Sequence, residues 1–474
     1  MSFKQDFLSK LSFPPTANQD ELVLHLEYFF FQQNLINCFI LRGYAGTGKT
    51  TMIATLVKTL PEYRIRTILL APTGRASKVL SSYSKKMAST CHRFIYISVR
   101  DADGNQRFIL KENKFRNTVF IVDEASMVSD ISSEGVLFSN RNLLEDLLLF
   151  ASSGDNCKLI FVGDTAQLPP VGSDVSPALD RDYLLSHFSQ DSMVYELSEV
   201  VRQALDSGIL KNASNVRYSI SNKRVRFPYL KSEDLDDFIR LDPSLLEETL
   251  RDEYYKNSVD EVVMICRSNK SANQFNNHIR YRILDKENEI DVGDHIMCVK
   301  NNYYWLDEDS EAGFIANGDI MVIKRILRYN DIHNRRYADI IVSLLDYDDH
   351  PEVELTVMLD TLSLNSPSLT NAESSELYHK IAEDYMDIKT KKERNKAIKA
   401  DPYYNALQIK FAYCLTCHKA QGGQWNTVFV DQGYFTDDMH NIEFLRWLYT
   451  AITRAKTKIY LTNFKDEFFA ERND

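Results

Sequence analysis

A glycine-rich loop directly after an apolar run constrains the fold of this chain more than any other feature. Residues 38–41 predict a strand, Gly43-Tyr-Ala-Gly-Thr-Gly-Lys-Thr50 follows it, and a helical stretch begins near Thr51. Glycines let backbone N–H groups turn inward around phosphate oxygens, and the following helix presents its positive dipole end to the same anion. A strand, a loop and a helix in this order predict an α/β sheet with a phosphate site at its edge.

Short apolar runs alternate with helical stretches through the first part of the chain, which is typical of a parallel sheet covered by helices. The predicted strands are residues 38–41, 67–71, 119–122, 159–162 and 193–197. Ligands of such sheets bind where the carboxyl ends of the strands meet the loops, so we expect the active site there. Between the second and third strands, residues 94–100 and 106–111 flank Asp101-Ala-Asp-Gly-Asn105, which predicts a β-hairpin that projects from the sheet.

A second alternating region predicts another α/β sheet, which a long insertion interrupts. Its predicted strands are residues 262–266, 428–431 and 459–462. The insertion has β-branched runs and polar turns typical of a small antiparallel barrel, with strands predicted at residues 319–328, 337–345 and 353–362. Asn371 is then expected to cap a charged helix that ends before Pro402. The apolar face of that helix consists of Leu377, Ile381, Tyr385 and Ile388.

Composition excludes several classes of protein. With 44% hydrophobic and 26% charged residues, the chain is globular rather than disordered or fibrous. The 56 basic and 67 acidic residues give a net charge of −11, which argues against a protein that coats nucleic acid by bulk attraction, so a polyanion must bind in a local groove. The seven cysteines lack framework spacing, no apolar run reaches membrane-spanning length, and the N-terminus lacks the apolar core of a signal peptide. We therefore expect a cytoplasmic protein that does not contact membranes.

Two carboxylates after the strand at residues 119–122 add chemistry to the phosphate loop. Lys49 is expected to reach the β- and γ-phosphates of a nucleotide and Thr50 to place its hydroxyl on Mg²⁺. Asp123 can reach the Mg²⁺ shell, and Glu124 can orient an attacking water. Together these residues predict an NTPase that hydrolyses its nucleotide.

Two short fragments resemble other kinds of site. Asn269-Lys-Ser-Ala272 resembles a guanine-reading turn, but Ala272 stands where a carboxylate is needed, so we interpret the fragment as accidental. Cys414-Leu-Thr-Cys417-His418 fits the rule for haem attachment, and a Cys-x-x-Cys pair can also hold zinc or form a disulfide. Because no second cysteine pair has zinc spacing, we expect these thiols to be small core groups next to a strand.

Further motifs occur in one order along most of the chain. They are Gln19 in Thr16-Ala-Asn-Gln19, Ala71-Pro-Thr-Gly-Arg-Ala76, Thr90-Cys-His92, Gly163-Asp-Thr-Ala-Gln167-Leu-Pro-Pro170, Val201-Arg202-Gln203, Thr416-Cys-His-Lys-Ala-Gln-Gly422 and Tyr449-Thr-Ala-Ile-Thr-Arg454-Ala-Lys456. With the phosphate loop and the acidic pair, this order resembles superfamily one helicases, most closely the RecD-like and Dda-like group that moves 5′ to 3′ on single-stranded DNA.

The resemblance implies an α/β fold with two RecA-like motor domains, an inserted β-hairpin that acts as a duplex-splitting pin, and an inserted small barrel that bears a helical arm. The predicted ranges are 1–92 with 116–210 for the first motor domain, 93–115 for the hairpin, 211–318 with 411–474 for the second motor domain, and 319–410 for the barrel and arm. ATP hydrolysis at the interface of the two motor domains then drives movement along the strand.

The resemblance also assigns roles to residues. The ATP-binding residues are Gln19, Gly43, Tyr44, Ala45, Gly46, Thr47, Gly48, Lys49, Thr50 and Thr51. The catalytic residues are Lys49, Thr50, Asp123, Glu124, Gln167, Arg202 and Arg454, with Thr50 and Asp123 holding Mg²⁺. The DNA-binding residues are Pro72, Thr73, Thr90, His92, Thr416, His418 and Lys419.

The sequence thus predicts an ATP-dependent DNA helicase that acts as a monomer on single-stranded DNA and duplex junctions. Its motifs leave open an RNA-stimulated helicase, and an ATP-switched loader that binds nucleic acid without unwinding it. A small-molecule kinase fits less well, because no acceptor site is evident and the second α/β region is then superfluous. No protein partner follows from the sequence.

Overall fold

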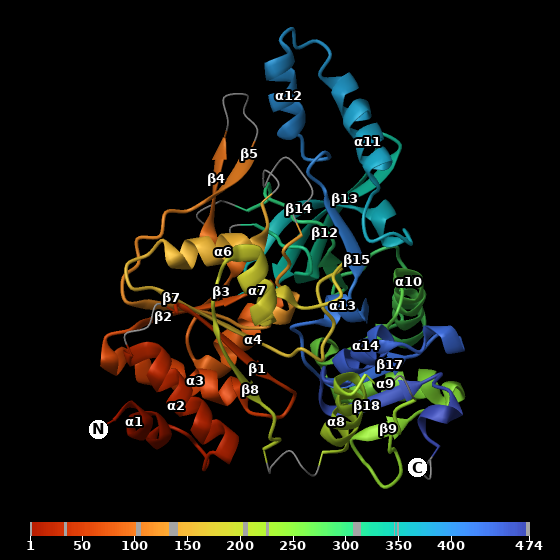
Figure 1. Ribbon diagram of the computed structural model, residues 1–474. Helices are drawn as coiled ribbons and strands as arrows, with labels where there is room; N and C mark the ends of the chain where they lie inside the picture. The colour runs from red at the N-terminus through yellow and green to blue at the C-terminus, as the bar shows by residue number, and fades with distance from the viewer. Residues whose placement is uncertain are drawn as a thin grey trace.

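The computed structural model describes most of the chain. The described residues are 2–32, 36–100, 106–131, 141–201, 207–223, 227–306, 314–345, 347 and 350–470. Two parallel sheets with their helices fill the lower part of the view in Figure 1, and a barrel, a hairpin and a pair of helices rise above them. The α/β class predicted from the sequence is confirmed. Within the described residues, no helix is long and apolar enough to cross a membrane.

The first α/β unit is a six-stranded parallel sheet with helices on both faces. Its strand order is β3-β2-β6-β7-β1-β8. The strands are β1 (Cys38–Gly43), β2 (Arg66–Ala71), β3 (Ala88–Thr90), β6 (Thr118–Val122), β7 (Lys158–Gly163) and β8 (Met193–Leu197). The helices are α1 (Phe3–Ser9), α2 (Ala17–Phe31), α3 (Lys49–Thr59), α4 (Gly74–Ser84), α5 (Cys91–Ile95), α6 (Leu143–Ser152) and α7 (Arg181–Phe188). Central strands such as β6 are buried along their whole length, as parallel strands covered on both faces must be.

The second α/β unit is a five-stranded parallel sheet. Its strand order is β16-β10-β17-β18-β9. The strands are β9 (Phe238–Arg240), β10 (Val262–Cys266), β16 (Cys414–Thr416), β17 (Trp425–Asp431) and β18 (Ala455–Thr462). The helices are α8 (Gly208–Ser221), α9 (Leu246–Lys256), α10 (Asn269–His278), α13 (Cys417–Ala420) and α14 (Ile442–Ile452). Helix α14 is buried at nearly every position and packs against α8.

The insertion forms a closed five-stranded barrel, and the barrel is larger than the sequence predicts. Its strands are β11 (His295–Cys298), β12 (Ile320–Ile332), β13 (Arg335–Leu344), β14 (Glu352–Met358) and β15 (Leu407–Phe411). Strand β11 lies before residue 319, where the insertion was expected to start, because its hydrogen bonds to both β12 and β15 are needed to close the barrel. The predicted strand at 353–362 is too long, since its last four residues form a 3-10 turn (Leu359–Leu362).

The predicted hairpin is β4 (Tyr96–Arg100) paired with β5 (Gln106–Leu110). The expectation that residue 94 begins the first strand is wrong, because Phe94 belongs to α5, whose first turn the Thr90 hydroxyl caps. The tip that contains Asp101 and Asp103 lies outside the described residues. Near the hairpin base, the Phe108 ring lies 4.6 Å from that of Tyr303, so the hairpin packs against the loop that follows β11.

The charged helix predicted after residue 371 is two helices, α11 (Asn371–Asp384) and α12 (Lys391–Lys399), which we call the arm. The cap is Thr370 rather than Asn371: its hydroxyl accepts the N–H of Glu373, whose carboxylate accepts the N–H of Thr370 in return. Of the four residues predicted to form one apolar face, Leu377 and Ile381 are buried, together with Ile398 of α12. Tyr385 and Ile388 lie beyond the last residue of α11 and are half-buried, because the helix ends before them.

Candidate nucleotide and strand site

The phosphate loop joins β1 to α3 at the carboxyl edge of the first sheet. Gly46 and Gly48 have φ angles of 77° and 85°, a region in which glycine is strongly preferred. A Cβ atom at Gly48 would lie 2.4 Å from Nε2 of Gln19. The Lys49 ammonium donates to the carbonyl oxygens of Gly43 at 2.5 Å and Tyr44 at 3.0 Å, so its charge is held at the mouth of the loop.

Gln19 connects α2 to the loop. Its Oε1 accepts the N–H of Thr16 at 3.1 Å, and its Nε2 donates to the carbonyl oxygen of Thr47 at 3.0 Å. The amide is therefore fixed beside the loop, which places Gln19 on the wall of the same cavity as Lys49. Its predicted contact with adenine stays a prediction.

The acidic pair follows β6 and lies opposite the loop. Asp123 Oδ1 accepts the N–H of Glu124 at 2.9 Å, and its Oδ2 accepts the hydroxyl of Tyr83. Burial, and then the neighbouring Glu124 carboxylate, raise the pKa of Asp123 to about 6. Glu124 has a φ of 51°, a left-handed conformation that costs roughly 1–2 kcal/mol for a residue with a Cβ. The turn at Glu124 ends the strand here and leaves both carboxylates on the cavity wall.

Tyr83 was not identified from the sequence. Its hydroxyl contacts both Asp123 and Thr50, the two residues predicted to hold Mg²⁺, and burial is the largest cause of its raised pKa. Mg²⁺ in phosphate-transfer sites binds one or two protein oxygens together with phosphate oxygens and waters. A threonine hydroxyl beside a half-buried carboxylate fits that donor set, and the described residues contain no cluster of three or more His, Cys, Asp or Glu that could hold a metal without the phosphates.

Arg454 reaches this cavity from the second α/β unit. Its Nη1 lies 3.9 Å from Oε1 of Glu124, across the interface between the two units. The guanidinium is buried and donates to the carbonyl oxygens of Thr450 at 3.1 Å and Gly423 at 3.2 Å, and to the Thr453 hydroxyl at 3.1 Å. These bonds fix its orientation, so its positive charge is aimed before any ligand binds.

Tyr449, on α14, is a second residue, after Tyr83, whose role the sequence did not identify. Its hydroxyl accepts the N–H of Ala45 in the phosphate loop at 3.0 Å and donates to Oδ2 of Asp164 at 2.6 Å. Burial, and then the Asp164 carboxylate, raise the pKa of Tyr449, so the hydroxyl keeps its proton. One side chain of the second unit thereby joins two segments of the first. The only signal in the sequence was its place in the motif that contains Arg454.

The segment after β7 is held by the second unit at further points. The N–H of Leu168 donates to the Thr450 hydroxyl at 2.9 Å, and its carbonyl oxygen accepts Nε2 of Gln421 at 2.8 Å. The neighbouring Gln167 is buried, and its Oε1 has no hydrogen-bond partner among the described residues. A buried acceptor without a donor is uncommon in proteins, and it fits a position that a ligand or an ordered water completes.

Lys49, the acidic pair, Tyr83, Gln167 and Arg454 line one cavity of about 640 Å³ between the two units. The predicted residues on its wall are Gln19, Tyr44, Ala45, Gly46, Gly48, Lys49, Thr50, Thr51, Asp123, Glu124, Gln167 and Arg454. Gly43 and Thr47 do not line it: Gly43 ends β1, and the buried Thr47 donates its hydroxyl to the Tyr44 carbonyl oxygen at 2.8 Å. Arg202 lies outside the described residues. The roles of all these residues remain predictions.

The predicted strand contacts of the first unit lie at the starts of helices. Thr73, after Pro72, caps α4 by accepting the N–H of Ala76 at 3.2 Å, and Thr90 caps α5 by accepting the N–H of Arg93 at 3.3 Å. Each hydroxyl keeps its own proton for another acceptor. His92 follows Thr90, and burial lowers the pKa of its imidazole to about 4, so the ring is neutral at ordinary pH.

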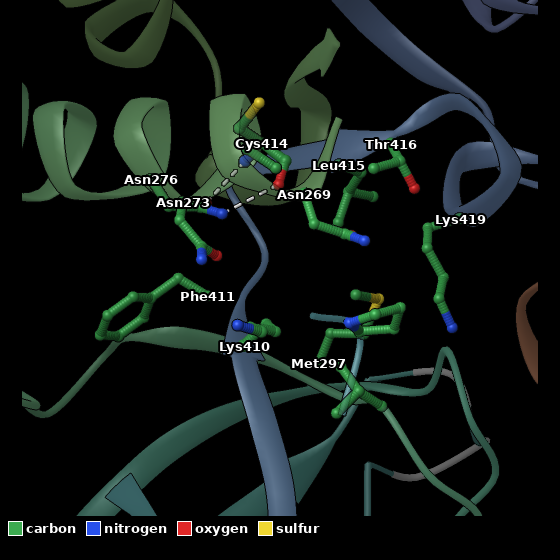
Figure 2. A pocket seen from close by; sticks show the side chains of 13 residues that line it. Asn269, Asn273, Asn276, Met297, Lys410, Phe411, Cys414, Leu415, Thr416 and Lys419 are labelled. Atoms are coloured by element: carbon green, nitrogen blue, oxygen red, sulfur yellow. Dashed lines mark hydrogen bonds between the residues drawn. The ribbon is translucent and has the colours of Figure 1, made fainter. Parts of the chain in front are cut away.

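The predicted strand contacts of the second unit are Thr416, His418 and Lys419. Figure 2 shows Thr416 and Lys419 on the wall of a small cavity of about 20 Å³ between the barrel and the second sheet. Lys419 donates to the side chain of Asn317, and burial lowers its pKa and that of His418. Deeper in the cavity, Lys410 is buried and has a pKa lowered to about 8 for the same reason.

The two sets of strand contacts meet at a close approach of backbone. A Cβ atom at Gly422 would lie 2.8 Å from Cβ of Ala76 and 3.4 Å from Oγ1 of Thr73. Beside them, the Arg75 guanidinium lies 4.0 Å from the centre of the Trp425 ring. The segments that carry Thr73 and Thr416 therefore reach the same interface that carries the nucleotide cavity.

Cys414 and Cys417 are buried, as expected of core groups. Asn276 anchors this strand. Its amide nitrogen Nδ2 donates to the Cys414 carbonyl oxygen at 2.9 Å, and its Oδ1 accepts the Cys414 N–H at 2.7 Å (Figure 2). Oδ1 also accepts the N–H of Tyr413, so the side-chain amide of Asn276 satisfies backbone groups at the start of this strand.

Comparisons with known proteins match both α/β units. The AAA domain family matches residues 32–173, and the UvrD-like helicase C-terminal domain family matches residues 411–462. The ATP-dependent DNA helicase dda of Enterobacteria phage T4 is 25% identical over 89% of this chain and 93% of its own length. The RecBCD enzyme subunit RecD of Buchnera aphidicola subsp. Schizaphis graminum is 24% identical over 91% of this chain and 71% of its own. A solved structure of Pif1 helicase from Bacteroides, in complex with ADP-AlF3 and ssDNA, aligns over 97% of this chain and 95% of its own, with 16% identity and a TM-score of 0.48.

Proposed function

This chain belongs to the RecD/Dda/Pif1-like helicase superfamily, and from that premise we propose that it is an ATP-dependent DNA helicase that moves 5′ to 3′ on single-stranded DNA. The whole-length similarity to the T4 helicase supports the DNA substrate, and the order of the motifs supports the direction of movement. Both walls of the nucleotide cavity come from one chain, which supports a monomeric motor. Seven free, buried cysteines support a reducing, cytoplasmic location.

One observation carries the proposal: groups of both α/β units line one nucleotide-sized cavity. The first unit contributes Lys49 and the acidic pair, and the second contributes Arg454. Phosphoryl transfer spreads negative charge over equatorial oxygens, which preorganised cations stabilise. Because these cations belong to different units, hydrolysis requires both units to be in place around the triphosphate.

Each side chain has a task in this proposal. Lys49 binds the β- and γ-phosphates, and Glu124 accepts a proton from the attacking water and orients it. Arg454 stabilises the charge that develops on the transferred phosphoryl group. Thr50 and Asp123 would hold Mg²⁺, which when bound neutralises phosphate charge. Tyr83 keeps the Asp123 carboxylate oriented toward that position.

The same interface couples hydrolysis to the strand. The segment of Asp164 and Gln167 is bonded to α14 and to Gln421, which lies three residues beyond His418 in the motif that carries the predicted strand contacts. A change at the γ-phosphate therefore reaches that motif through hydrogen bonds rather than through solvent. We propose that closing and opening of the interface alternate the grip of the two units on the strand.

The test uses partial duplexes with a single-stranded tail of one polarity. We expect ATP-dependent unwinding of the 5′-tailed duplex only; unwinding restricted to 3′ tails would refute the direction. Larger stimulation of ATP hydrolysis by RNA than by DNA would favour the RNA helicase, and DNA-stimulated hydrolysis without strand separation would favour the loader.

The assignment of the nucleotide site is tested with Lys49→Ala, which removes a charge that contacts phosphate. We expect ATP turnover to fall by roughly two to three orders of magnitude, the range seen when a single preorganised group is removed. Lys58→Ala, at the exposed opposite end of the same helix, is the matched control and should retain full turnover.

A further inference from the structure

The second helix of the arm, together with the turn before it, carries a positive charge that the proposed cycle does not use. Residues 385–400 contain six basic and two acidic residues, in a chain with 56 basic and 67 acidic residues overall. One of the two acids, Glu393, is engaged at the start of α12, where its carboxylate accepts the Thr390 hydroxyl at 2.7 Å. The whole arm, residues 371–400, contains seven basic and six acidic residues, so the positive charge is concentrated in α12 and the turn before it.

Five of the six basic residues are exposed lysines, and we call four of them the lysine face: Lys389, Lys391, Lys392 and Lys396. All four are exposed, and none forms an ion pair with another described residue. Lys392 and Lys396 are four residues apart, so they lie on the same side of α12, away from the buried Ile398. Lys391 lies seven residues before Ile398, on the side of the helix nearer the core, and is exposed at the helix start.

Helix stability does not account for the lysine face. Positive charge near the N-terminus of a helix opposes the helix dipole, yet Lys391 and Lys392 are the first two residues of α12. Like charges four residues apart, as at Lys392 and Lys396, are also destabilising, by roughly 0.2–0.5 kcal/mol. A polyanion bound across the face would relieve both effects.

The arm is packed firmly enough to hold this face in place. Ile398 of α12 is buried in a small core with Ile381 of α11, and this core includes Tyr337 and Met358 of the barrel. The Arg394 guanidinium bonds back to the carbonyl oxygen of Ile388 at 2.9 Å, which closes the turn between the two helices.

Contacts connect the base of the arm to the hairpin. Tyr303 packs against Phe108 of the hairpin at 4.6 Å between ring centres. The adjacent Tyr304 donates its hydroxyl to the carbonyl oxygen of Ala400, at the end of α12, at 2.9 Å. One loop therefore braces both elements, and in Figure 1 the hairpin and the arm extend from the same side of the molecule.

We propose that the lysine face binds the phosphate backbone of duplex DNA ahead of the point at which the hairpin separates the strands. The inference rests on the proposed helicase function. Proteins that bind single strands combine cations with aromatic side chains that stack on bases, and α12 carries no aromatic residue. Protein interfaces are depleted in lysine, so a protein partner fits the face less well. Duplex DNA, with one charge per about 1.7 Å of axis, matches a group of exposed lysines without further specificity.

The experiment compares Lys391→Gln/Lys392→Gln/Lys396→Gln with a control that has the same change in net charge, Lys58→Gln/Lys211→Gln/Lys256→Gln, at exposed positions of the two α/β units. Glutamine has nearly the helix propensity of lysine, so α12 is retained. Affinity is measured against salt concentration for a 5′-tailed fork and for the tail oligonucleotide alone. For the fork we expect the slope of log affinity against log salt to fall by about three in the arm variant and to be unchanged in the control.

The outcomes separate the inference from the proposed function. A loss of slope on the fork with none on the tail oligonucleotide supports the duplex contact. Equal losses on both DNAs, or no loss on either, overturn it, the first because the arm then holds the single strand and the second because the face then has no role in DNA binding. Lys391→Arg/Lys392→Arg/Lys396→Arg keeps the charge and should restore the slope, which excludes misfolding as the cause. If the wild-type chain lacked DNA-stimulated ATP hydrolysis, the proposed function itself would fail, independently of the arm.

Discussion

The interface between the two α/β units carries the proposed nucleotide site on one face, which we call the nucleotide face, and the predicted strand contacts on another, the strand face, and the two faces are built differently. On the nucleotide face, Arg454 is buried and Asp123 is half-buried, and each is held by at least two hydrogen bonds. The face with the predicted strand contacts presents hydroxyl groups that cap helices, Thr73 and Thr90, and a neutral imidazole, His92.

The difference follows from what each face has to do. Stabilising a developing charge requires cations and carboxylates that are oriented in advance, because reorientation during the reaction would raise the barrier. A strand that must slide requires contacts that are individually weak and alike from one nucleotide to the next. We therefore expect substitutions on the nucleotide face to have large effects on turnover, and those on the strand face to have smaller effects on coupling.

The largest effect is expected for Arg454→Ala. Arginines that stabilise the transition state in related chemistry contribute on the order of 10³–10⁵ in rate, so DNA-stimulated turnover should fall by at least about 10³. Affinity for single-stranded DNA, measured by fluorescence anisotropy, should change little, because Arg454 faces the nucleotide cavity. A loss of turnover below about tenfold would mean that the two faces do not differ in this way.

A smaller loss is expected for Tyr449→Phe, which removes the hydroxyl between Ala45 and Asp164 while keeping the ring. A hydrogen bond to a charged group contributes about 1.5–3 kcal/mol, so kcat/KM for ATP should fall roughly 10- to 100-fold. The matched control is Tyr460→Phe, whose hydroxyl donates to the buried Glu253 at 2.9 Å within the second unit. If both variants lost the same activity, the effect would belong to folding and not to the interface.

The strand face is tested with Gly422→Ala. The added Cβ meets Ala76 at 2.8 Å and must push apart the two segments that carry the predicted strand contacts. We expect unwinding to fall by about tenfold, with turnover reduced much less, because a small displacement of a positioning contact can cost that much. The control is Gly318→Ala, which has a similarly positive φ of 103° but no atom within 4 Å of its Cβ. A matching loss in the control would show that backbone strain, rather than the contact, is the cause.

The smallest effect is expected for His92→Asn and appears in stability. Burial lowers the pKa of His92 to about 4, whereas histidine in an unfolded chain titrates near 6.5. Between these values the unfolded chain binds a proton that the folded chain does not, so His92 reduces stability progressively as the pH falls. The unfolding temperature of the wild type should therefore decline more steeply between about pH 6.5 and 4.5 than that of the variant. The exposed His25, changed to Asn, serves as the control, and equal slopes in His92→Asn and wild type would contradict the prediction.

Much of the fold could be predicted because its signals are local. The strands expected at residues 38–41, 119–122 and 159–162 all lie within β1, β6 and β7. The predictions are wrong where contacts between residues far apart in the sequence determine the bounds of an element. Strand β11 joins the barrel through partners far along the chain in β15, and the expected helix after residue 371 divides because α12 folds back onto α11.

The residues of the candidate site fall into the same two groups, those that local sequence identifies and those that only packing brings together. Lys49 and Asp123 could be identified because each follows a strand at a spacing that carries its own chemical meaning. Tyr83 and Tyr449 could not, because a tyrosine hydroxyl takes whatever partner the packing brings to it. The pair formed by Tyr449 and Ala45 spans 404 positions of the chain.

The sequence by itself determined which segment forms a glycine-rich phosphate-type loop, which segments carry carboxylates and which begin helices, since these properties depend on neighbouring residues and on backbone geometry. Only the tertiary structure decided that Arg454 lies 3.9 Å from Glu124 and that the arm and the hairpin share one supporting loop. The physical reason is that such distances result from the packing of whole sheets and helices against one another, and no short stretch of sequence contains that information.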